Sequence, residues 1–521
     1  MDDAQDIGAE LRAHPPAEDA ANPRPPPGPS SRSQIRTVFL GIGSRGALMA
    51  INMLVLMVTS RLIAPPEFGA YAIAQLCVDL AAAFAYPLVG VPMLQARRFD
   101  RDDRAIAFTL LLLLGVVAGG LLALSAPTLE TALGLPLLAH LLTGTAVIVP
   151  LRFVATYFIA SLQRQSRVEQ VIWAQTRSQI VSSLGVTLLG AVLGFHVWAL
   201  LAGLGTATLL ELYWTARAAS DRPGLRLGRR AWAFLGQGLG PLAHGAVVFT
   251  ADAVDKIAIG RGFGAFALGV YTRAANLVLI PQGLLGIPAQ STLFAWFSRY
   301  KSEPPRVSAA LTKALEIQGL LLLPATVCAG LASPILILVL LGNQWTGAVP
   351  VAQALFVGAF ARLGSIPSDV AALTLGHGWN SARRQFATIL VLCAGLAISF
   401  GHSVVWAAAA VSASRLLGYL LGLRFAARTF HVPWRAIVVG HARGAALAAF
   451  GLAAVWAVQA LVSTELPLLA DLVRVSAFSL AVALALALGP DVLAAPAGLS
   501  ATRRHRMGIP HLATALRRLR A

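Results

Sequence analysis

Long apolar runs alternate with short polar gaps along nearly the whole chain. About 20 apolar residues form an α-helix that crosses roughly 30 Å of hydrocarbon, and fourteen runs reach or approach that length. They lie near residues 37–60, 68–96, 105–125, 137–162, 169–193, 196–216, 232–257, 263–298, 307–333, 346–375, 385–401, 403–425, 436–461 and 467–489. The pattern predicts an all-α polytopic membrane protein with about 14 transmembrane helices, and a hydrophobic content of 57% agrees with it.

Basic residues gather in every second gap between these runs. The gap at residues 97–104 contains four arginines, whereas the intervening set of gaps contains Arg61, Lys256 and Arg261. The positive-inside rule then predicts that the basic gaps and both chain termini are cytoplasmic. Most of the net charge of +18 is therefore explained by basic residues that set the orientation of the spans in the membrane. It does not indicate nucleic-acid binding, because no folded soluble region remains to present a basic patch.

The two ends of the chain differ in composition. Residues 1–36 are rich in proline and poor in large apolar side chains, so we expect a disordered cytoplasmic tail. Residues 490–521 form a basic cytoplasmic tail. This second tail either lies as a short helix on anionic headgroups or stays solvated.

A short sequence block occurs twice. Residues 67–74 read EFGAYAIA and residues 262–269 read GFGAFALG, and six apolar runs separate the two copies. An even number of spans preserves orientation, so the two halves are predicted to be parallel repeats, as in several transporters. Chance identity is the alternative, because Gly and Ala are abundant in this chain.

Proline pairs follow both copies of the block at similar distances. Pro87 and Pro92 interrupt the second run, and Pro281 and Pro288 interrupt the eighth. Each proline removes a backbone N–H and kinks its helix. Matching kinks in two halves favour a gated central cavity; the alternative is that neighbouring helices simply absorb them.

Arginines within the apolar runs are candidate substrate ligands. A charge in hydrocarbon is costly unless it faces water, a partner or a ligand, and guanidinium offers a fork that suits phosphate oxygens. For any single arginine, a structural ion pair or a snorkelling side chain is the alternative. Together with Arg61 at an outer gap, the predicted cavity set is Arg45, Arg61, Arg152, Arg177, Arg273 and Arg362.

Acidic residues within the runs are candidates for ion coupling. Asp252 and Asp255 lie about one helical turn apart and could together hold a proton or a sodium ion. A structural pair of Asp255 with Lys256 or Arg261 is the alternative. Asp79 and Glu211 are isolated acids and complete the candidate set.

Metal, disulfide and catalytic chemistry are not indicated. Cys77, Cys328 and Cys393 all fall within apolar runs and lack metal-ligand spacing. The longest outer gap, at residues 126–136, contains one acid, Glu130, and the outer gaps hold no paired carboxylates or Ser/His/Asp set. We therefore expect no enzyme activity, no metal and no cofactor other than coupling to a proton or sodium gradient.

Two stretches resemble a known family. Residues 59–74, TSRLIAPPEFGAYAIA, resemble the first outer junction of bacterial polysaccharide-exporting flippases, and residues 255–274, DKIAIGRGFGAFALGVYTRA, resemble the second-half signature of the same group. The chain is similar from about residue 37 to 489 to the Wzx-type members of the multidrug/oligosaccharidyl-lipid/polysaccharide (MOP) exporter superfamily. Among the candidate arginines, Arg45, Arg61 and Arg273 match basic positions of related flippases.

The resemblance implies both a domain organisation and an activity. It implies a six-helix lobe at 37–217, a cytoplasmic linker at 218–231, a second six-helix lobe at 232–428 and helices 13 and 14 at 429–489. It further implies a V-shaped cavity and alternating access, which carries an undecaprenyl-diphosphate-linked oligosaccharide to the periplasmic leaflet of the inner membrane. The product would serve exopolysaccharide, capsule or lipopolysaccharide synthesis, with a polymerase and export machinery as partners.

Two other classes of protein stay open. A cation-coupled multidrug or metabolite antiporter of the same superfamily would share the fold, although we expect acids to outnumber arginines in its cavity. A membrane polymerase or ligase acting on the same lipid-linked sugars would need a larger outer loop with catalytic residues.

Overall fold

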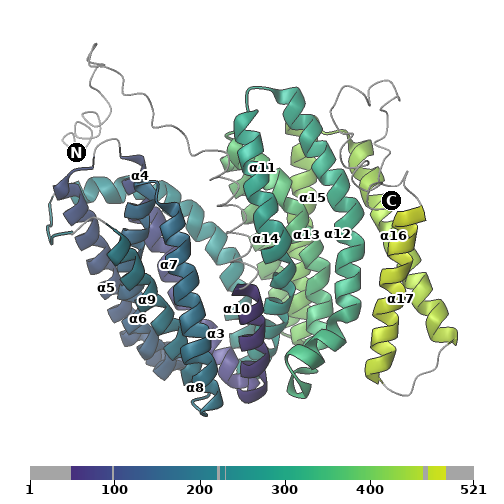
Figure 1. The fold of residues 1–521 in the computed structure, drawn as a ribbon, viewed down its shortest axis with the longest axis horizontal. Helices are drawn as coiled ribbons and strands as arrows, with labels where there is room; N and C mark the ends of the chain where they lie inside the picture. Colours follow the sequence, from purple (N-terminus) through teal and green to yellow (C-terminus); the bar gives the residue numbers. More distant parts are fainter. Residues whose placement is uncertain (1–47, 97–98, 220–222, 229, 462–466, 489–521) are drawn as a thin grey trace, which may run out of the picture. The chain divides into compact units, whose positions relative to one another are not determined.

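The computed structural model describes residues 48–96, 99–219, 223–228, 230–461 and 467–488, apart from some side chains within residues 233–295. Every regular element in these ranges is a helix. The chain divides into two compact units, which we describe separately (Figure 1). The first unit comprises Met1–Ala275, Leu336–Val351 and Ile389–Ala410, and the second comprises Asn276–Ile335, Ala352–Thr388 and Val411–Ala521.

The chain as far as α10 supplies most of the first unit. Its helices are Leu48–Leu62, α3 (Pro65–Ala85), the π-helical turn η1 (Tyr86–Gly90), α4 (Val91–Gln95), α5 (Arg101–Leu133), α6 (Leu138–Arg164), α7 (Val168–Val181), the π-helical turn η2 (Ser182–Leu188), α8 (Leu189–Val192), α9 (Val197–Ala218) and α10 (Arg230–Pro281).

The remaining elements belong wholly or partly to the second unit, apart from the 3₁₀ turn η4 in the first. They are η3 (Gln282–Gly286), α11 (Ile287–Arg299), α12 (Pro304–Leu340), η4 (Asn343–Trp345), α13 (Ala348–Thr374), α14 (Gly378–Ser399), α15 (Val404–Thr429), α16 (Trp434–Leu461) and α17 (Pro467–Leu488).

Aromatic and aliphatic side chains form the core of the first unit. Leu111 of α5 and Phe153 and Tyr157 of α6 are buried together with Met93 of α4. Phe108 meets Tyr157 edge to face with a centroid separation of 5.3 Å, a geometry that aromatic pairs favour. Figure 1 shows α5, α6 and α9 running side by side in this unit.

Helices α7 and α8 pair with α9 along its length. At one end, Gln175 of α7 hydrogen-bonds to Glu211 of α9. Farther along, the Ser182 hydroxyl donates to the Gly203 carbonyl oxygen, and beyond it a Cβ atom at Gly190 would contact Ala199. The contacts follow an antiparallel register, so that residues of α7 lie at the same depth as their partners in the carboxyl half of α9.

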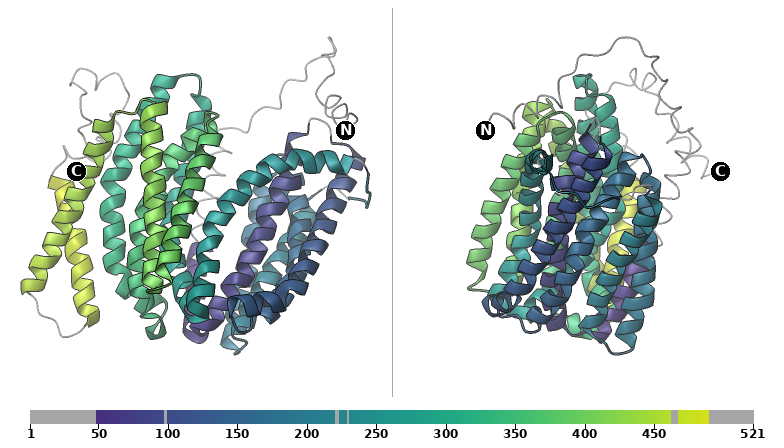
Figure 2. Two further views of the ribbon diagram at one scale, coloured as in Figure 1. Left: turned by 180° about the vertical axis from the view of Figure 1, so that it is seen from behind. Right: turned by 90° about the vertical axis from the view of Figure 1, so that its left-hand side faces the viewer.

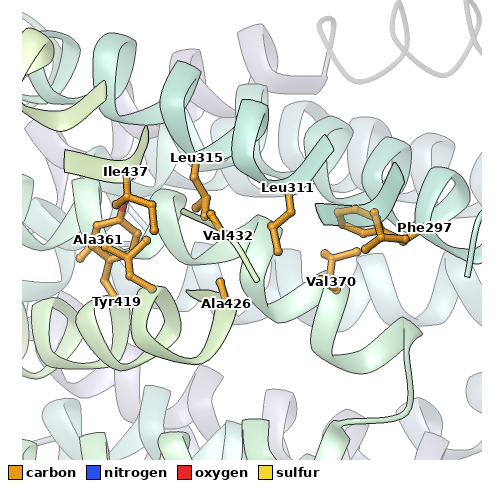
Figure 3. Packing of buried hydrophobic residues seen from close by; sticks show 12 residues of the cluster. Phe297, Leu311, Leu315, Ala361, Val370, Tyr419, Ala426, Val432 and Ile437 are labelled. Atoms are coloured by element: carbon orange, nitrogen blue, oxygen red, sulfur yellow. The ribbon is translucent and has the colours of Figure 1, made fainter. Parts of the chain in front are cut away.

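A continuous apolar cluster holds the second unit together. Figure 3 shows Leu311 and Leu315 of α12 between residues of neighbouring helices, including Val370 of α13 and Tyr419 of α15. Ile437 of α16 closes one end of the cluster. These side chains pack against one another and so give the unit a single close-packed interior.

The last two helices form an antiparallel pair. Figures 1 and 2 show α16 and α17 side by side, in the region where the hydropathy pattern predicts helices 13 and 14. The helix α16 also packs on α12, because a Cβ atom at Gly444 would overlap the Gly319 carbonyl oxygen. Small residues let membrane helices approach this closely.

The predicted proline interruptions coincide with π-helical turns. The turn η1 contains Pro87 and precedes Pro92, and the turn η3 begins directly after Pro281 and precedes Pro288. A π-helical turn accommodates the backbone groups that proline leaves without a helical partner. The segments that follow the two copies of the sequence block therefore share this local deviation, and the parallel repeat of two halves stays a prediction.

The second copy of that block begins at a break within α10. Gly264 has φ 81° and ψ 179°, so α10 consists of two helical segments that meet there. Only glycine adopts this backbone conformation without strain. The break lies at the predicted boundary between the seventh and eighth apolar runs.

Eleven helices among the described residues are long and apolar enough to cross a membrane. The difference from the predicted fourteen has local causes. The helix Leu48–Leu62 is too short in its described part, the α7–α8 segment is polar and contains η2, and the seventh and eighth runs are joined in α10. The count of 14, the lobe boundaries and the cytoplasmic location of both termini stay predictions.

Candidate functional site

Arg273 is a buried cation within a candidate membrane span. It lies on the second segment of α10 and is 7% exposed. Its guanidinium carbon is 3.4 Å from the ring centroid of Phe68 and 5.9 Å from that of Trp345. Its Nε has no hydrogen-bond partner, and no carboxylate of the described residues forms an ion pair with it. The aromatic faces of Phe68 and Trp345 therefore stabilise the charge through cation–π attraction.

Trp345 connects this arginine to the end of the first described helix. Its indole N–H donates to the Ser60 carbonyl oxygen at 2.6 Å, and Gln344 donates to the same oxygen. The Trp345 side chain is fully buried and meets Phe68 edge to face at 5.6 Å. We call Ser60, Phe68, Arg273, Gln344 and Trp345 the Trp345 cluster.

Arg61 lies beside this cluster and contacts backbone. Its Nη2 donates to the Val339 carbonyl oxygen at 2.8 Å, in the last turn of α12. The last four carbonyl groups of a helix lack partners within the helix, and a cation there also interacts favourably with the helix dipole. Arg61 is otherwise exposed, so that only part of its hydrogen-bonding capacity is used.

Arg152 and Glu211 form an ion pair inside the first unit. The Arg152 Nη1 of α6 contacts Glu211 Oε2 of α9, and the Glu211 side chain is 8% exposed. Gln175 Nε2 of α7 donates to the other carboxylate oxygen at 3.0 Å. Arg152, predicted as a phosphate ligand, and Glu211, predicted as an ion-coupling acid, thus pair with each other. For Arg152 this is the structural ion pair that the sequence left open as the alternative to substrate binding.

Arg177 is exposed and lies between two indoles. Its guanidinium carbon is 5.5 Å from the ring centroid of Trp173 and 5.8 Å from that of Trp214. Among the described residues it forms no ion pair with a carboxylate. It lies two residues from Gln175 on α7, about half a helical turn, and so points to a different side of that helix.

Asp255 is buried and hydrogen-bonded across the break in α10. Tyr271 donates its hydroxyl to one carboxylate oxygen, and the backbone N–H of Lys256 donates to the other at 2.7 Å. Because Asp255 precedes Gly264 and Tyr271 follows it, this contact ties the two segments of α10 together. The neighbouring candidate Asp252 has its side chain outside the described residues, and the candidate Arg45 lies outside them entirely.

Asp79 is an exposed carboxylate in the interior of α3. It has no hydrogen bond or ion pair with any described residue.

The second unit contains the remaining candidate, Arg362, half-buried on α13. It also contains an ion pair that the sequence did not single out, in which Arg384 Nη2 lies 3.0 Å from Asp369 Oδ1. The Arg384 guanidinium stacks on Phe425 at 4.9 Å. Among the described residues, no group of three or more His, Cys, Asp or Glu side chains could hold a metal ion.

The arrangement defines a polytopic membrane protein with charged groups in its spans. Its fold is that of MOP-superfamily transporters. A solved structure of the lipid II flippase MurJ in an inward closed conformation matches 87% of this chain and 100% of that chain, with a TM-score of 0.70 and 12% identity. An inward-facing multidrug resistance MATE family transporter of the MOP superfamily matches 75% of this chain and 98% of its own, with a TM-score of 0.57 and 13% identity.

The chain belongs to the family described as polysaccharide biosynthesis protein, whose model matches residues 58–350. It is 26% identical over 328 residues to the succinoglycan biosynthesis transport protein ExoT of Rhizobium meliloti (strain 1021), covering 62% of this chain and 65% of the relative. It is 20% identical over 332 residues to the lipopolysaccharide biosynthesis protein WzxC of Escherichia coli (strain K12), covering 60% and 64%. The matches thus span less than two thirds of either relative. The resemblance inferred from the two sequence stretches is confirmed.

Proposed function

We propose that this protein is a flippase for lipid-linked oligosaccharides. It would move an undecaprenyl-diphosphate-linked repeat unit from the cytoplasmic to the periplasmic leaflet of a bacterial inner membrane by alternating access. Membership of the polysaccharide biosynthesis family supports the proposal, as does the similarity to the succinoglycan biosynthesis transport protein ExoT. The fold shared with a lipid II flippase is compatible with it.

Arg273 is the observation that carries this proposal. An arginine in a membrane span costs several kcal/mol unless a partner or ligand compensates it, and Arg273 has no anionic partner among the described residues. A diphosphate supplies oxygen acceptors that match the guanidinium fork. Phe68 and Trp345 hold the fork in place beforehand, which reduces the entropy that binding would cost.

The other candidate arginines would play unequal parts. Arg45, Arg61 and Arg177 remain candidate ligands for the headgroup, and Arg362 is the candidate from the second unit. Arg152 is a weaker candidate, because its charge is already paired with Glu211. The flipped repeat units would then pass to a polymerase and to export machinery on the periplasmic side.

Asp79 is our candidate for coupling transport to a proton or sodium gradient. An exposed carboxylate within a span needs a cation, a proton or water, and Asp79 has no ion-pair partner among the described residues. The same observation favours the second candidate function, a cation-coupled antiporter for drugs or metabolites. Two of the other candidate acids already have partners. Glu211 forms an ion pair with Arg152, and Asp255 accepts a hydrogen bond from Tyr271.

The lipid-linked oligosaccharide pool of a deletion strain tests the proposal. We expect loss of surface glycan together with undecaprenyl-linked repeat units trapped on the cytoplasmic leaflet, and recovery when the gene is returned. Replacing both Arg45 and Arg273 with alanine, at normal membrane abundance, should abolish that recovery. An unchanged pool and unchanged surface glycan would refute the flippase and direct attention to drug and metabolite efflux.

A further inference from the structure

A histidine within a candidate membrane span takes no part in the proposed transport site. His441 is half-buried on α16, a helix that is long and apolar enough to cross the membrane. Histidine is the side chain that ordinarily changes its charge between about pH 5 and 8. A charge inside a span is costly, so uptake of a proton by His441 changes the energy of the packing around it.

Two hydrogen bonds fix which nitrogen of the neutral ring carries the hydrogen. Nδ1 lies 2.6 Å from the carbonyl oxygen of Ile437, one turn earlier on α16. A carbonyl oxygen only accepts hydrogen bonds, so Nδ1 is the donor. Nε2 therefore keeps its lone pair and accepts a hydrogen bond from the Tyr419 hydroxyl at 2.5 Å. The neutral form of His441 thus uses both ring nitrogens and joins α16 to α15.

The surroundings of this hydrogen bond are closely packed. A Cβ atom at Gly319 of α12 would lie 2.8 Å from the His441 Nδ1 atom. Tyr419 is 2% exposed, and Phe360 of α13 meets the Tyr419 ring and the His441 ring edge to face, at 5.3 Å and 6.0 Å. No carboxylate of the described residues forms an ion pair with His441. A positive charge on this ring would therefore lie among rings and backbone without an anion in contact.

Few of the described charged groups lie next to His441. Glu316 of α12 adjoins the preceding residue of α16, because a Cβ atom at Gly440 would lie 2.8 Å from the Glu316 Cα atom. The Glu316 carboxylate is already paired with Lys313 at 3.6 Å. Arg415 lies one turn before Tyr419 on α15. The other charged residues of α12, α13, α15, α16 and α17 lie on another side of their helix or further along it, namely Arg306, Arg362, Asp369, Arg424, Arg428, Arg435, Arg443, Asp471 and Arg474.

Protonation of His441 reverses the hydrogen-bonding requirement at Nε2. The protonated ring donates from both nitrogens, whereas the Tyr419 hydroxyl also directs its hydrogen at Nε2. Tyr419 has no second hydrogen-bond partner among the described residues, so a rotated hydroxyl loses its acceptor at a buried position. The new charge is in addition poorly compensated by its surroundings. Both effects favour the separation of α16 from α15.

We propose that His441 is a proton-binding site that controls the packing of α16 in the second unit. The neutral ring holds α16 on α15 through Tyr419, and the protonated ring releases it. Gly440 and Gly444 of α16 lie directly against the backbone of α12, so a shift of α16 also acts on that helix. The inference goes beyond the proposed function and depends neither on the cargo nor on the site around Arg273.

Hydrogen–deuterium exchange of the purified full-length protein in nanodiscs tests the proposal. The exchange rate of backbone amides in residues 436–447 of α16 is measured at about pH 8 and about pH 5. Each rate is divided by that of the His441→Gln variant at the same pH, so that the intrinsic pH dependence of exchange cancels. Glutamine accepts a hydrogen bond from Tyr419 but takes up no proton. We expect equal rates at about pH 8 and about fivefold faster exchange of the wild type at about pH 5, the equivalent of one hydrogen bond.

Tyr419→Phe tests the hydrogen bond itself. Without the hydroxyl donor, the α16 amides should exchange faster than in the wild type at about pH 8 and gain little more at about pH 5. His402→Gln is the matched control, because His402 is exposed and stacks on Trp406 at the start of α15. It should keep the wild-type response, and it replaces His441→Gln as the reference if that variant does not fold. Equal pH responses of wild type and His441→Gln, or a wild-type rate for Tyr419→Phe at the higher pH, would overturn the proposal.

Discussion

Gly69 of α3 lies directly against the backbone of Ala265 on α10. A Cβ atom at Gly69 would overlap the Ala265 carbonyl oxygen, and a Cβ atom at Gly269 would overlap the carbonyl oxygen of Pro65. Gly69 and Gly269 belong to the two copies of the repeated sequence block. The two copies therefore pack on each other where their helices begin, and this contact requires glycine for reasons of space.

Replacing Gly69 with alanine should force α3 and α10 apart. Overpacking typically costs about 1–3 kcal/mol, and we expect the upper part of that range because the obstacle is backbone. The measurement is the thermal unfolding midpoint of the purified protein in one detergent. Gly120→Ala is the control, because nothing lies within 4 Å of a Cβ atom there, and it should leave the midpoint unchanged or slightly raised. Equal midpoints for the two variants would contradict the packing argument.

The sequence predicted the fold where hydropathy and proline dominate. The apolar runs mark the helices, and Pro87 and Pro281 mark two of the three described π-helical turns, η1 and η3, whereas η2 contains no proline. In α10 the hydropathy pattern separated the runs at 232–257 and 263–298, and the structure has a break at Gly264 close to that boundary. Hydropathy averages over about 19 residues, so it did not show that a single glycine, and not a loop, joins the two helical segments.

Arg273→Lys should lose most export although it keeps the positive charge. Lysine has no planar group to stack on Phe68 and cannot form the two parallel hydrogen bonds of a guanidinium fork. We expect at least a tenfold drop in the rate of surface-glycan recovery in the deletion strain, at equal membrane abundance. Arg261→Lys, an exposed substitution on the same helix, should recover export fully. Full activity of Arg273→Lys would show that charge alone suffices.

Trp345 should contribute to stability through both its ring and its indole N–H. Trp345→Phe keeps a ring beside Phe68 but removes the hydrogen bond to Ser60, which should cost about 0.5–1.5 kcal/mol. Trp345→Ala empties a fully buried position and should cost about 3–5 kcal/mol. Thermal unfolding midpoints should therefore rank wild type, then Phe, then Ala. A midpoint for Trp345→Ala equal to that of the wild type would contradict the burial of the ring.

The candidate site was only partly accessible to sequence reasoning. Intramembrane arginines stand out by their cost, which is why Arg152 and Arg273 were selected. Their partners were not predictable, because Glu211 is 59 residues from Arg152 along the chain and only the packing of α6 on α9 brings them together. Trp345 was missed because it lies in a gap between two predicted spans, where the only signal was an aromatic residue near the end of an apolar run.

Glu211→Gln should destabilise the protein by leaving Arg152 without its carboxylate. Breaking a buried pair typically costs about 3–5 kcal/mol, and the partial exposure of Arg152 places the expected value at the lower end. The double variant Arg152→Gln/Glu211→Gln should recover part of this loss, because no charge is then left unpaired. Thermal unfolding of the two single variants and the double variant measures the coupling. A stable Glu211→Gln variant that no longer exports would instead assign ion coupling to this carboxylate.

Asp79→Asn should remove the response to an ion gradient while leaving the fold intact. Asp79 makes no hydrogen bond or ion pair with any described residue, so that the amide costs little stability. In proteoliposomes, an imposed proton or sodium gradient should accelerate flipping of the extracted lipid-linked oligosaccharide by the wild type and have no effect on the variant. Glu303→Gln, at an exposed acid next to Arg306, should respond as the wild type does. A normal gradient response of Asp79→Asn would move the coupling site to another of the candidate acids, Asp252, Asp255 or Glu211.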